Sequence, residues 1–510
     1  MLDRILKPID DILNVITMYR LMLYYLIFLW GAALFFSFLN KFPFSPLQLI
    51  ISTTIIVLVS WITNTLFAKF LKAITNLESV YITALILILI ITPFRNFSEL
   101  PFLIIAPILA MVSKYLFSIN KKHIFNPVAI SVFIPSIISL GAASWWIGTS
   151  IMLPFVLIGG LLVVRKIRRY DLVFFFTVFA VSVISIFSIL NGFDVFQIIL
   201  RTFVDSPIIF FAFVMLTEPL TTPPTKKLQI IYAGIIALIF YPLFHIGPIS
   251  STPEMALLIG NIYSYLISPK GKLILTLKEK VKISPDTYDF IFSKNKNFKF
   301  TPGQYLEWTL GYKNPDSRGN RRYFTIASSP TENELRIGIK FYPNPSSFKN
   351  KMLLMREGDK ILAGQLSGDF TLPRKSNNEL IFIAGGIGIT PFRSMIKYLI
   401  DNNIKMPITI FYANKTIDEI VYKDVFDDAE KNLGIKTIYS LTDVENIPTE
   451  WKGERGRITE EIIKKYAPKY KNSYFYLSGP HEMIIHFEET LYKIGIRINR
   501  IRKDFFPGYA

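Results

Sequence analysis

The sequence contains no cysteine and only four histidines among its 510 residues. Without cysteine, the chain can form no disulfide, no thiolate zinc site and no cysteine-bound iron–sulfur cluster. A membrane haem would need paired axial histidines on neighbouring helices. The N-terminal half offers only His123 and His245, which fall at an inner loop and at the outer end of an apolar run. We therefore expect no metal site and no haem, so any redox chemistry must rest on flavins, quinones or a separate partner.

Acidic residues are also scarce, because 38 Asp and Glu stand against 56 Lys and Arg, which gives a formal net charge of +18. A strongly basic chain can bind nucleic acid, but this one has no basic–aromatic nucleic-acid module. The basic residues instead collect beside long apolar runs, where they orient membrane helices. The lipid bilayer, and not nucleic acid, is therefore the expected partner of these charges.

Long apolar runs fill residues 19–268, whereas residues 271–510 have the composition of a soluble domain pair. The first run is followed by many more, so it is interpreted as a membrane span rather than a cleaved signal peptide. The third and fifth runs are short, and we expect them to be tilted, broken or partly re-entrant. The expected spans, about ten in number, are residues 19–39, 46–68, 79–93, 101–118, 127–141, 145–164, 171–190, 195–216, 228–245 and 253–268. They define a polytopic helical membrane domain over residues 1–268.

Basic residues also predict the orientation of these spans. With the N-terminus in the cytoplasm, the outer loops hold only Lys41 and Arg95. The inner segments then hold Arg4, Lys7, Lys69, Lys72, Lys121, Lys122, Arg165, Lys166, Arg168, Arg169, Lys226 and Lys227. Cytoplasmic loops carry this kind of excess. We therefore expect a multi-pass protein of the cell membrane with both termini in the cytoplasm.

The pattern changes after a short polar link at residues 268–272. Alternating strand patterns at 272–277 and 286–292 predict an antiparallel β-barrel over residues 271–374. Residues 380–384, 391–402 and 408–412 then follow the order strand, helix, strand. This is the βαβ rhythm of a doubly wound parallel sheet, so residues 375–510 are predicted to form an α/β nucleotide-binding domain.

A glycine cluster links the first of these strands to its helix. Gly385, Gly386 and Gly388 let the backbone approach a pyrophosphate, and the helix that opens near Thr390-Pro391 offers free N–H groups to the anion. About sixty residues earlier the chain reads Arg322-Tyr323-Phe324-Thr325. Together these motifs resemble the ferredoxin–NADP reductase superfamily, which implies a FAD-binding barrel followed by a domain that binds NADH or NADPH.

The resemblance implies roles for the matching residues of the barrel. Arg322 would donate to the FAD diphosphate, Phe324 would stack on the isoalloxazine, and the Thr325 hydroxyl would hydrogen-bond at flavin N5. Ser346-Ser347 would begin a helix and receive phosphate. The other expected FAD contacts, in the turns at 300–305 and 364–373 and beside Arg322, are Gly303, Gln304, Tyr305, Tyr323 and Gly368.

In the second domain, residues 476–483 (YLSGPHEM) resemble the family's Cys-Gly-Pro-x-x-Met strand end, with serine in place of cysteine. Ser478 would contact the nicotinamide, and Phe506 in the C-terminal tail would shield the flavin face. Asn414 and Lys415 follow the strand at 408–412. Because Lys415 is the available point charge there and no arginine accompanies it, NADH is favoured over NADPH. The remaining expected nucleotide contacts are Gly479, Pro480 and Met483.

Three polar motifs interrupt the apolar half. They are 123–127 (HIFNP) with Asn126, the loop 216–225 with Thr217, Glu218 and Thr222, and the pair Gly260-Asn261. In this order, and over most of residues 20–268, they resemble the D-type membrane protein of the Rnf complex and the B-type membrane protein of the sodium-pumping NADH:quinone oxidoreductase. The alternative is that these turns only cap and break helices.

One position departs from that resemblance. Those relatives hold FMN through a phosphoester on a threonine about ten residues before the loop acid, where this chain has Ile208, and the hydroxyls of Thr202 and Ser206 are out of register. Covalent FMN is therefore not expected, and a non-covalent FMN or riboflavin, or a quinone, could occupy the site. Arg201 and Asp205 are spaced i, i+4, and they form either a functional ion pair within the membrane or an anchor at its outer interface.

These features predict a membrane-bound NAD(P)H oxidoreductase. It would pass hydride to FAD and electrons onward to a flavin or quinone in the membrane half, with coupling to Na⁺ or H⁺ transport left open. Two alternatives remain. The reductase could serve a separate electron-transfer protein, with the membrane half as its anchor, or the chain could be a transporter whose soluble half senses redox state.

Overall fold

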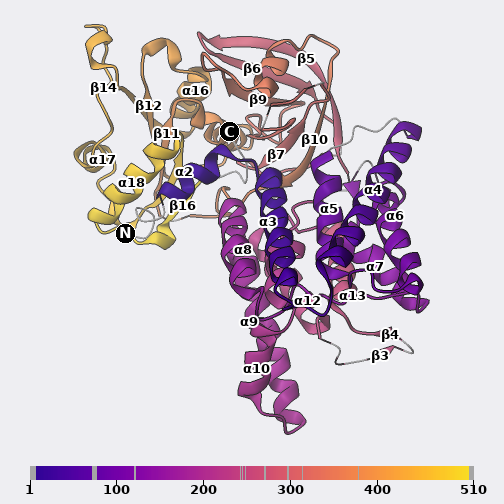
Figure 1. Ribbon diagram of the computed structural model, residues 1–510. Coiled ribbons are helices and arrows are strands. Elements are labelled where there is room, and N and C mark those ends of the chain that lie inside the picture. Colours follow the sequence, from indigo (N-terminus) through magenta and orange to yellow (C-terminus); the bar gives the residue numbers. More distant parts are fainter. Residues whose placement is uncertain are drawn as a thin grey trace. The chain divides into compact units, whose positions relative to one another are not determined.

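The computed structural model describes residues 7–71, 77–119, 122–241, 243, 245–246, 249–268, 271–295, 298–312, 314–316, 318–376 and 378–504. The chain divides into two compact units, with the boundary between Lys272 and Leu273. The first unit is built from helices, and the second contains two six-stranded sheets (Figure 1).

Each segment predicted to span the membrane contains a helix. After α2 (Lys7–Val15), these helices are α3 (Met18–Phe38), α4 (Pro46–Phe70), α5 (Leu77–Ile90), α6 (Leu100–Leu116), α7 (Pro127–Ile137), α8 (Leu153–Ile167), α9 (Tyr170–Leu190), α10 (Val195–Val204), α12 (Lys226–Ile239) and α13 (Pro253–Ile267). Within the part of the chain that the structure describes, four helices are long and apolar enough to cross a membrane, or five if one bent pair counts as a single span. The first unit therefore has the helices of a membrane protein, and the larger number of spans stays a prediction.

Two of the predicted spans differ from the structure. The sixth was expected from residue 145, but α8 begins at Leu153, because the backbone N–H groups of Ser144 and Trp145 donate to Ile90 O at the end of α5. The eighth was expected as one helix over 195–216. It is broken after Val204 and continues, bent by 59°, as α11 (Ile208–Phe210) and the π-helical turn η2 (Phe211–Met215). Pro207 explains the break, since proline has no N–H and disfavours a helical residue before it.

The first sheet of the second unit is antiparallel. Its strands are β5 (Leu273–Ser284), β6 (Thr287–Ser293), β7 (Tyr305–Thr309), β8 (Arg321–Thr325), β9 (Glu334–Lys340) and β10 (Lys360–Ser367), in the order β8-β7-β10-β5-β6-β9. The short helix α14 (Ser347–Leu353) follows β9. Fully buried Phe290, Trp308 and Phe348 lie in the core of this sheet. The predicted antiparallel sheet is present, and its closure into a barrel stays a prediction.

The second sheet is parallel throughout. Its strands are β11 (Leu380–Gly385), β12 (Ile408–Asn414), β13 (Lys436–Leu441), β14 (Glu454–Arg455), β15 (Tyr474–Ser478) and β16 (Ile501–Lys503), in the order β14-β13-β12-β11-β15-β16. Its helices are α15 (Thr390–Asp401), α16 (Lys423–Leu433), α17 (Glu460–Tyr466) and α18 (His481–Lys493) (Figure 1). The strand order reverses beside β11, and such a switch point opens a ligand crevice at the carboxyl ends of the strands. The glycine cluster begins at that end of β11.

Candidate functional site

Strand pairing brings together the segments that were predicted to contact FAD. In the β7–β8 ladder, Tyr305 lies opposite Thr325, and the next N–H along, that of Ile326, donates to Gln304 O at 3.0 Å. Gly368 lies against them, because a Cβ added there would sit 3.2 Å from the Tyr305 ring. Three motifs that are far apart in the sequence therefore share one end of the sheet.

Two of the predicted contact residues are engaged inside the protein. Gln304 Oε1 accepts a hydrogen bond from Thr301 N at 2.8 Å, so this side chain closes its own turn. The Tyr323 hydroxyl donates to Glu307 Oε2 at 2.9 Å, and the tyrosine is buried. Gly303 has a φ of +92°, and a Cβ there would lie 2.0 Å from the carbonyl oxygen of Phe370. These residues shape the turn around Phe324 and Thr325, of which the first is half-buried and the second buried.

Three basic residues gather at the start of β8. Arg322 is 2% exposed and its Nη1 donates to Arg318 O at 2.7 Å. Lys349 belongs to α14, and burial, together with repulsion from Arg322 and Arg318, lowers its pKa to about 8. Mutually repelling cations that are held partly out of water favour a bound polyanion. Asp316 balances part of this charge, because its carboxylate lies 3.2 Å from Arg318 Nη2 and 3.8 Å from Arg322 Nη2. The remaining excess of positive charge fits the diphosphate of FAD, and Lys349 is a member that the motifs did not reveal, although it lies three residues after Ser346.

Ser346 and Ser347 take up capping positions, with a difference from the prediction. Ser346 Oγ accepts from Lys349 N at 3.3 Å and so caps α14. The helix start at Ser346-Ser347 was expected to receive phosphate, but the Ser347 N–H donates to Asp316 Oδ2 at 2.9 Å, and Arg318 N donates to the other oxygen at 3.0 Å. A carboxylate of the chain itself therefore occupies the position that was predicted for phosphate.

On the nucleotide side, the glycine cluster packs against the end of β15. A Cβ on Gly388 would lie 2.5 Å from Ser478 O and 2.6 Å from Gly479 atoms, and one on Gly385 would lie 2.4 Å from Met483 Sδ. Only glycine permits the approach of backbone to backbone at position 388, and at position 385 it makes room for the Met483 side chain. The two segments that were predicted to bind the dinucleotide are therefore neighbours, and Pro480 lies in the same turn.

The other predicted residues of the nucleotide-binding domain differ in burial and in their hydrogen bonds. Ser478 is buried and its hydroxyl donates to Asp504 Oδ2 at 3.1 Å, so the hydroxyl already has an acceptor. Asn414 is buried at the carboxyl end of β12, whereas Lys415 is exposed. Phe506, the predicted flavin shield, lies outside the described residues. Gly386, Thr390 and Pro391 lie in the turn and the first turn of α15 that follow β11.

Comparison with known proteins agrees with this geometry. Residues 382–489 match the model of the oxidoreductase NAD-binding domain family. The C-terminal part of the chain therefore contains an oxidoreductase NAD-binding domain, and we call residues 273–504 the reductase module. This reductase module is similar to Flavohemoprotein A of Dictyostelium discoideum, with 24% identity over 41% of this chain and 52% of that protein. It is also similar to sulfhydrogenase 2 subunit gamma of Pyrococcus furiosus, with 29% identity over 40% of this chain and 72% of that one.

A solved FAD/NAD-binding domain, from the nitric oxide dioxygenase of Vibrio cholerae, aligns with 46% of this chain and 98% of its own length, at 20% identity and a TM-score of 0.39. The chain spans about half the length of the flavohemoproteins that it matches. The resemblance of the N-terminal half to electron-transfer membrane proteins stays a prediction.

Apart from the reductase module, the three polar motifs of the helical unit converge. Asn126 Oδ1 caps α7 by accepting from Val128 N and Ala129 N, both at 3.0 Å. Its Nδ2 donates to Glu218 Oε2 at 2.9 Å, and its backbone N donates to Asn261 Oδ1 at 2.7 Å. The sequence identified each motif, but not that their side chains meet.

Glu218 is the centre of this polar cluster. His123 Nε2 lies 3.4 Å from Glu218 Oε1, and Thr221 Oγ1 donates to Oε2 at 2.9 Å. Thr217 and Thr222 contribute differently, because their hydroxyls donate to the backbone oxygens of Phe213 and Glu218. The capping interpretation therefore fits these two threonines, while Glu218, Asn126 and His123 form a candidate site.

The predicted ion pair in the eighth span is absent from the described ion pairs. Arg201 is exposed on α10, whereas Asp205 ends that helix and its Oδ1 accepts from Ser150 N at 3.2 Å. The backbone keeps its i, i+4 hydrogen bond from Asp205 N to Arg201 O at 2.8 Å, so the two residues remain one helical turn apart without forming an ion pair. Ser206 serves the same break, since its hydroxyl donates to Thr202 O at 2.5 Å and accepts from Ile208 N at 3.3 Å.

Proposed function

We propose that this protein is a membrane-bound NAD(P)H oxidoreductase that delivers electrons from its reductase module to a carrier in the helical unit. The observation that carries the proposal is the presence in one chain of a dinucleotide turn packed on β15, a basic anion site beside the flavin motif, and helices able to cross a membrane. NADH is the expected donor, because residues 413–416 after β12 contain Lys415 but no arginine to bind a 2′-phosphate.

FAD, when bound, supplies the conversion of a two-electron hydride into single electrons. Arg318, Arg322 and Lys349 would hold its diphosphate, and Phe324 would cover one face of the ring. Gly386, where an added Cβ would meet no atom within 4 Å, leaves the turn after β11 open towards a dinucleotide, whereas Gly385 and Gly388 let the same turn pack closely on the segment that follows β15. Thr325 is buried at the end of β8 and has a hydroxyl that would suit hydrogen bonding at the reacting edge of the ring. These groups need to align two reacting atoms rather than abstract a proton.

For the helical unit we propose an acceptor close to Glu218, either a non-covalent FMN or riboflavin, or a quinone. A carboxylate beside an imidazole can exchange the protons that accompany two-electron reduction of such a carrier. Glu218 and His123 are part-buried, with 23% and 13% of their side chains exposed, and a charge withdrawn from water is costly unless it is paired. The isoleucine at position 208 and the hydrogen-bonded Ser206 are the reasons for proposing a non-covalent carrier.

The test is a flavin count on the purified full-length protein, before and after denaturation, together with NADH oxidation in proteoliposomes that contain a quinone. Two released flavins, or oxidation that depends on the quinone, would support an acceptor in the membrane. One flavin, with no stimulation by quinone and full activity towards added soluble acceptors, would instead favour a membrane-anchored reductase for a separate electron-transfer protein. NADH binding without turnover would reject both and favour a redox sensor.

A further inference from the structure

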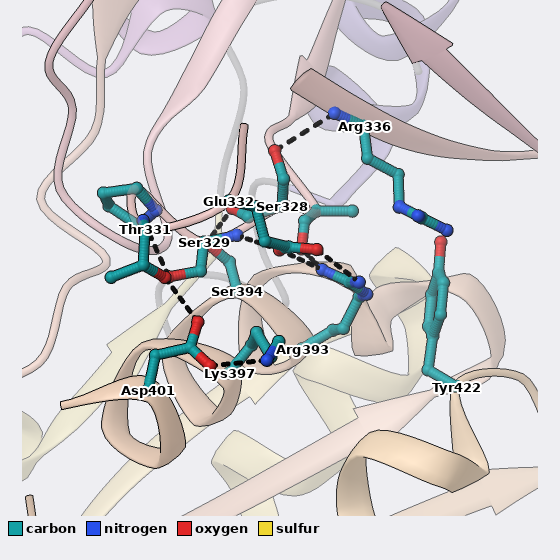
Figure 2. A network of polar contacts seen from close by, with 12 residues as sticks. Ser328, Ser329, Thr331, Glu332, Arg336, Arg393, Ser394, Lys397, Asp401 and Tyr422 are labelled. Carbon is teal, nitrogen blue, oxygen red and sulfur yellow. Dashed lines mark hydrogen bonds and ion pairs between the residues drawn. The ribbon is translucent and has the colours of Figure 1, made fainter. Parts of the chain in front are cut away.

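A buried polar contact joins the two sheet domains of the reductase module. It involves neither the flavin motif at Arg322–Thr325 nor the glycine turn at 385–388. Arg393, in the second turn of α15, is 5% exposed. Its Nη1 donates to Glu332 Oε2 and to Ala327 O, both at 2.8 Å, and its Nη2 donates to Glu332 Oε1 at 3.0 Å. The neighbouring Ser394 hydroxyl donates to Ser328 O at 2.6 Å. Figure 2 shows Arg393 and Ser394 on the side of α15 that faces Ser328 and Glu332.

The two ends of this contact lie close to the two predicted reaction motifs. Arg393 comes three residues after Thr390, where the glycine turn passes into α15. Ala327 and Ser328 come two and three residues after Thr325, the last residue of β8. Two consecutive residues of the nucleotide helix therefore hold two consecutive carbonyl groups of the flavin strand's extension. Bidentate Arg–carboxylate pairs fix orientation as well as distance.

The flavin-side partners are themselves held in place. Ser329 N donates to Glu332 Oε2 at 2.5 Å, which fixes the carboxylate that receives Arg393. Ala327 N donates to Arg336 O at 2.8 Å, and Arg336 N donates to Ser328 Oγ at 3.0 Å, so the segment is tied to β9. The arginine contact therefore connects α15 to the sheet and not to a loose loop.

A second contact lies beside the first. Asp289 of β6 is fully buried, accepts from Arg336 Nη1 at 2.8 Å, and also accepts from the hydroxyl of Tyr422 in the nucleotide domain. The Arg393 guanidinium lies 5.3 Å from the centre of the Tyr422 ring. Gly338 of β9 makes the approach possible, because a Cβ there would lie 2.5 Å from the Tyr422 hydroxyl and 3.0 Å from Thr390 Cγ2. The sheet and the dinucleotide turn thus touch directly.

We propose that Arg393, held by Glu332 and backed by Tyr422, is a positioning residue that sets the dinucleotide turn relative to the flavin strand. The inference rests on the proposed hydride transfer. In that step the nicotinamide C4–H bond breaks, the hydride with its electron pair adds to flavin N5, and the nucleotide leaves oxidised. Arg393 touches neither reacting atom. It fixes the distance between the segments that hold them, and a misplacement of about 1 Å at this stage costs up to 100-fold in rate.

The test uses full-length holoenzyme and rapid mixing with NADH, so that the flavin-reduction rate at saturation is separated from NADH affinity. Arg393→Gln is expected to lower the limiting rate about 10- to 100-fold, with a change in NADH dissociation constant of less than about threefold. Arg393→Lys keeps the charge but loses the fork, and it should recover only part of the rate. Arg500→Gln is the matched control, because Arg500 Nη1 donates to Lys471 O at 2.7 Å within the nucleotide domain.

Two further measurements separate positioning from simple loss of folding. Glu332→Gln and the double variant with Arg393→Gln should be strongly non-additive in the limiting rate, since both remove the same contact. In flavin-free protein, hydrogen exchange at residues 386–392 should rise in Arg393→Gln but not in Arg500→Gln. If Arg393→Gln does not fold, Ser394→Ala removes the neighbouring bond and takes its place in the rate and exchange measurements.

The outcomes distinguish a failure of the proposed function from a failure of the positioning role. A wild-type protein that binds FAD but is not reduced by NADH or NADPH would reject the proposed function. A wild-type protein that is reduced, with Arg393→Gln reduced at the same limiting rate, would overturn the positioning role alone. Loss of rate that merely follows loss of bound flavin, or additive effects of Glu332→Gln and Arg393→Gln, would also overturn it.

Discussion

Lys349 makes the affinity of the reductase module for FAD depend on pH. Burial, with repulsion from Arg322 and Arg318, lowers its pKa from 10.5 to about 8 in the flavin-free protein. A bound diphosphate would favour the charged ammonium and raise that pKa again. Binding of FAD is then linked to uptake of a proton above pH 8. We therefore expect tight binding at neutral pH and progressively weaker binding as the pH rises through about 8.

The size of the effect follows from the two pKa values. If bound FAD restores the pKa of Lys349 to its ordinary 10.5, the dissociation constant should be about tenfold higher at pH 9 than at pH 7. Below pH 7 the lysine is charged in both states, so this contribution to the pH dependence should vanish. Lys349→Met removes the titrating group and keeps most of the side chain's length.

The assay is titration of flavin-free protein with FAD, followed by flavin fluorescence, at several pH values in parallel for the wild type and Lys349→Met. Titrations of the flavin itself are common to both proteins and cancel in the comparison. The variant should bind more weakly at pH 7 and lose the tenfold change. Equal pH profiles for the two proteins would refute the assignment of Lys349 to the anion site, as would a wild-type affinity that does not change between pH 7 and 9.

Three further results are expected. Gly303→Ala should destabilise the reductase module by about 2–4 kcal/mol in denaturant unfolding, because Gly303 has a positive φ and the added Cβ would overlap Phe370 O. Gly358→Ala is the control and should cost only about 1–2 kcal/mol, since Gly358 has a φ of +86° and no atom lies within 4 Å of the added Cβ. Equal losses of stability in the two variants would contradict the close approach at Gly303. Burial by itself would raise the pKa of Glu332, but the hydrogen bonds and charge of Arg393, the Ser329 N–H and the charge of Arg336 together outweigh it and hold that pKa below its usual 4.5. This contribution to stability is present above pH 4.5 and is lost as the pH falls through the folded-state pKa. Glu332→Gln should flatten that acid limb in thermal unfolding, and an unchanged limb would exclude Glu332 as its source. Asn126→Ser keeps a capping oxygen but loses the donor to Glu218, so it should destabilise the helical unit in detergent by about 1–3 kcal/mol. Asn126→Asp should cost more stability at neutral pH than at acid pH, because at neutral pH its carboxylate lies beside that of Glu218. Equal losses of stability in the two variants at neutral pH would argue against the contact.

The sequence predicted the sheets and the glycine turn because their signals are local. A strand buried on both faces, such as 380–385, reads as one continuous apolar run, and the glycines follow at its end. Helix ends in the apolar half were harder to predict. Residues 145–152 are mostly apolar, so hydropathy does not separate their turns from the helix that follows. Pro207 was a usable signal for the break in the eighth span, and the long apolar run on either side of it outweighed that signal.

Contacts between distant segments could not be predicted in the same way. Arg393 follows the glycine turn in an ordinary amphipathic helix, and nothing in its neighbours shows that Glu332, 61 positions earlier, receives its side chain. Asp289 and Tyr422 are 133 positions apart, and each stands alone in its segment. In both contacts, a charged or hydroxyl group is buried against a polar partner from a distant segment. Burial of this kind depends on the tertiary structure and not on a spacing in the sequence.

Asn126 shows how a local interpretation and a tertiary one can both hold. Its oxygen caps α7, as an Asn-Pro turn predicts, and serine, threonine or aspartate could provide the same oxygen. An asparagine differs from these because its amide keeps N–H donors after the oxygen is used, and one of them reaches Glu218, 92 positions away. The cap of α13, Thr252, accepts from Met255 N with a hydroxyl that offers one donor at most. The choice of asparagine at the first cap is therefore explained by the carboxylate it contacts and not by the helix it begins.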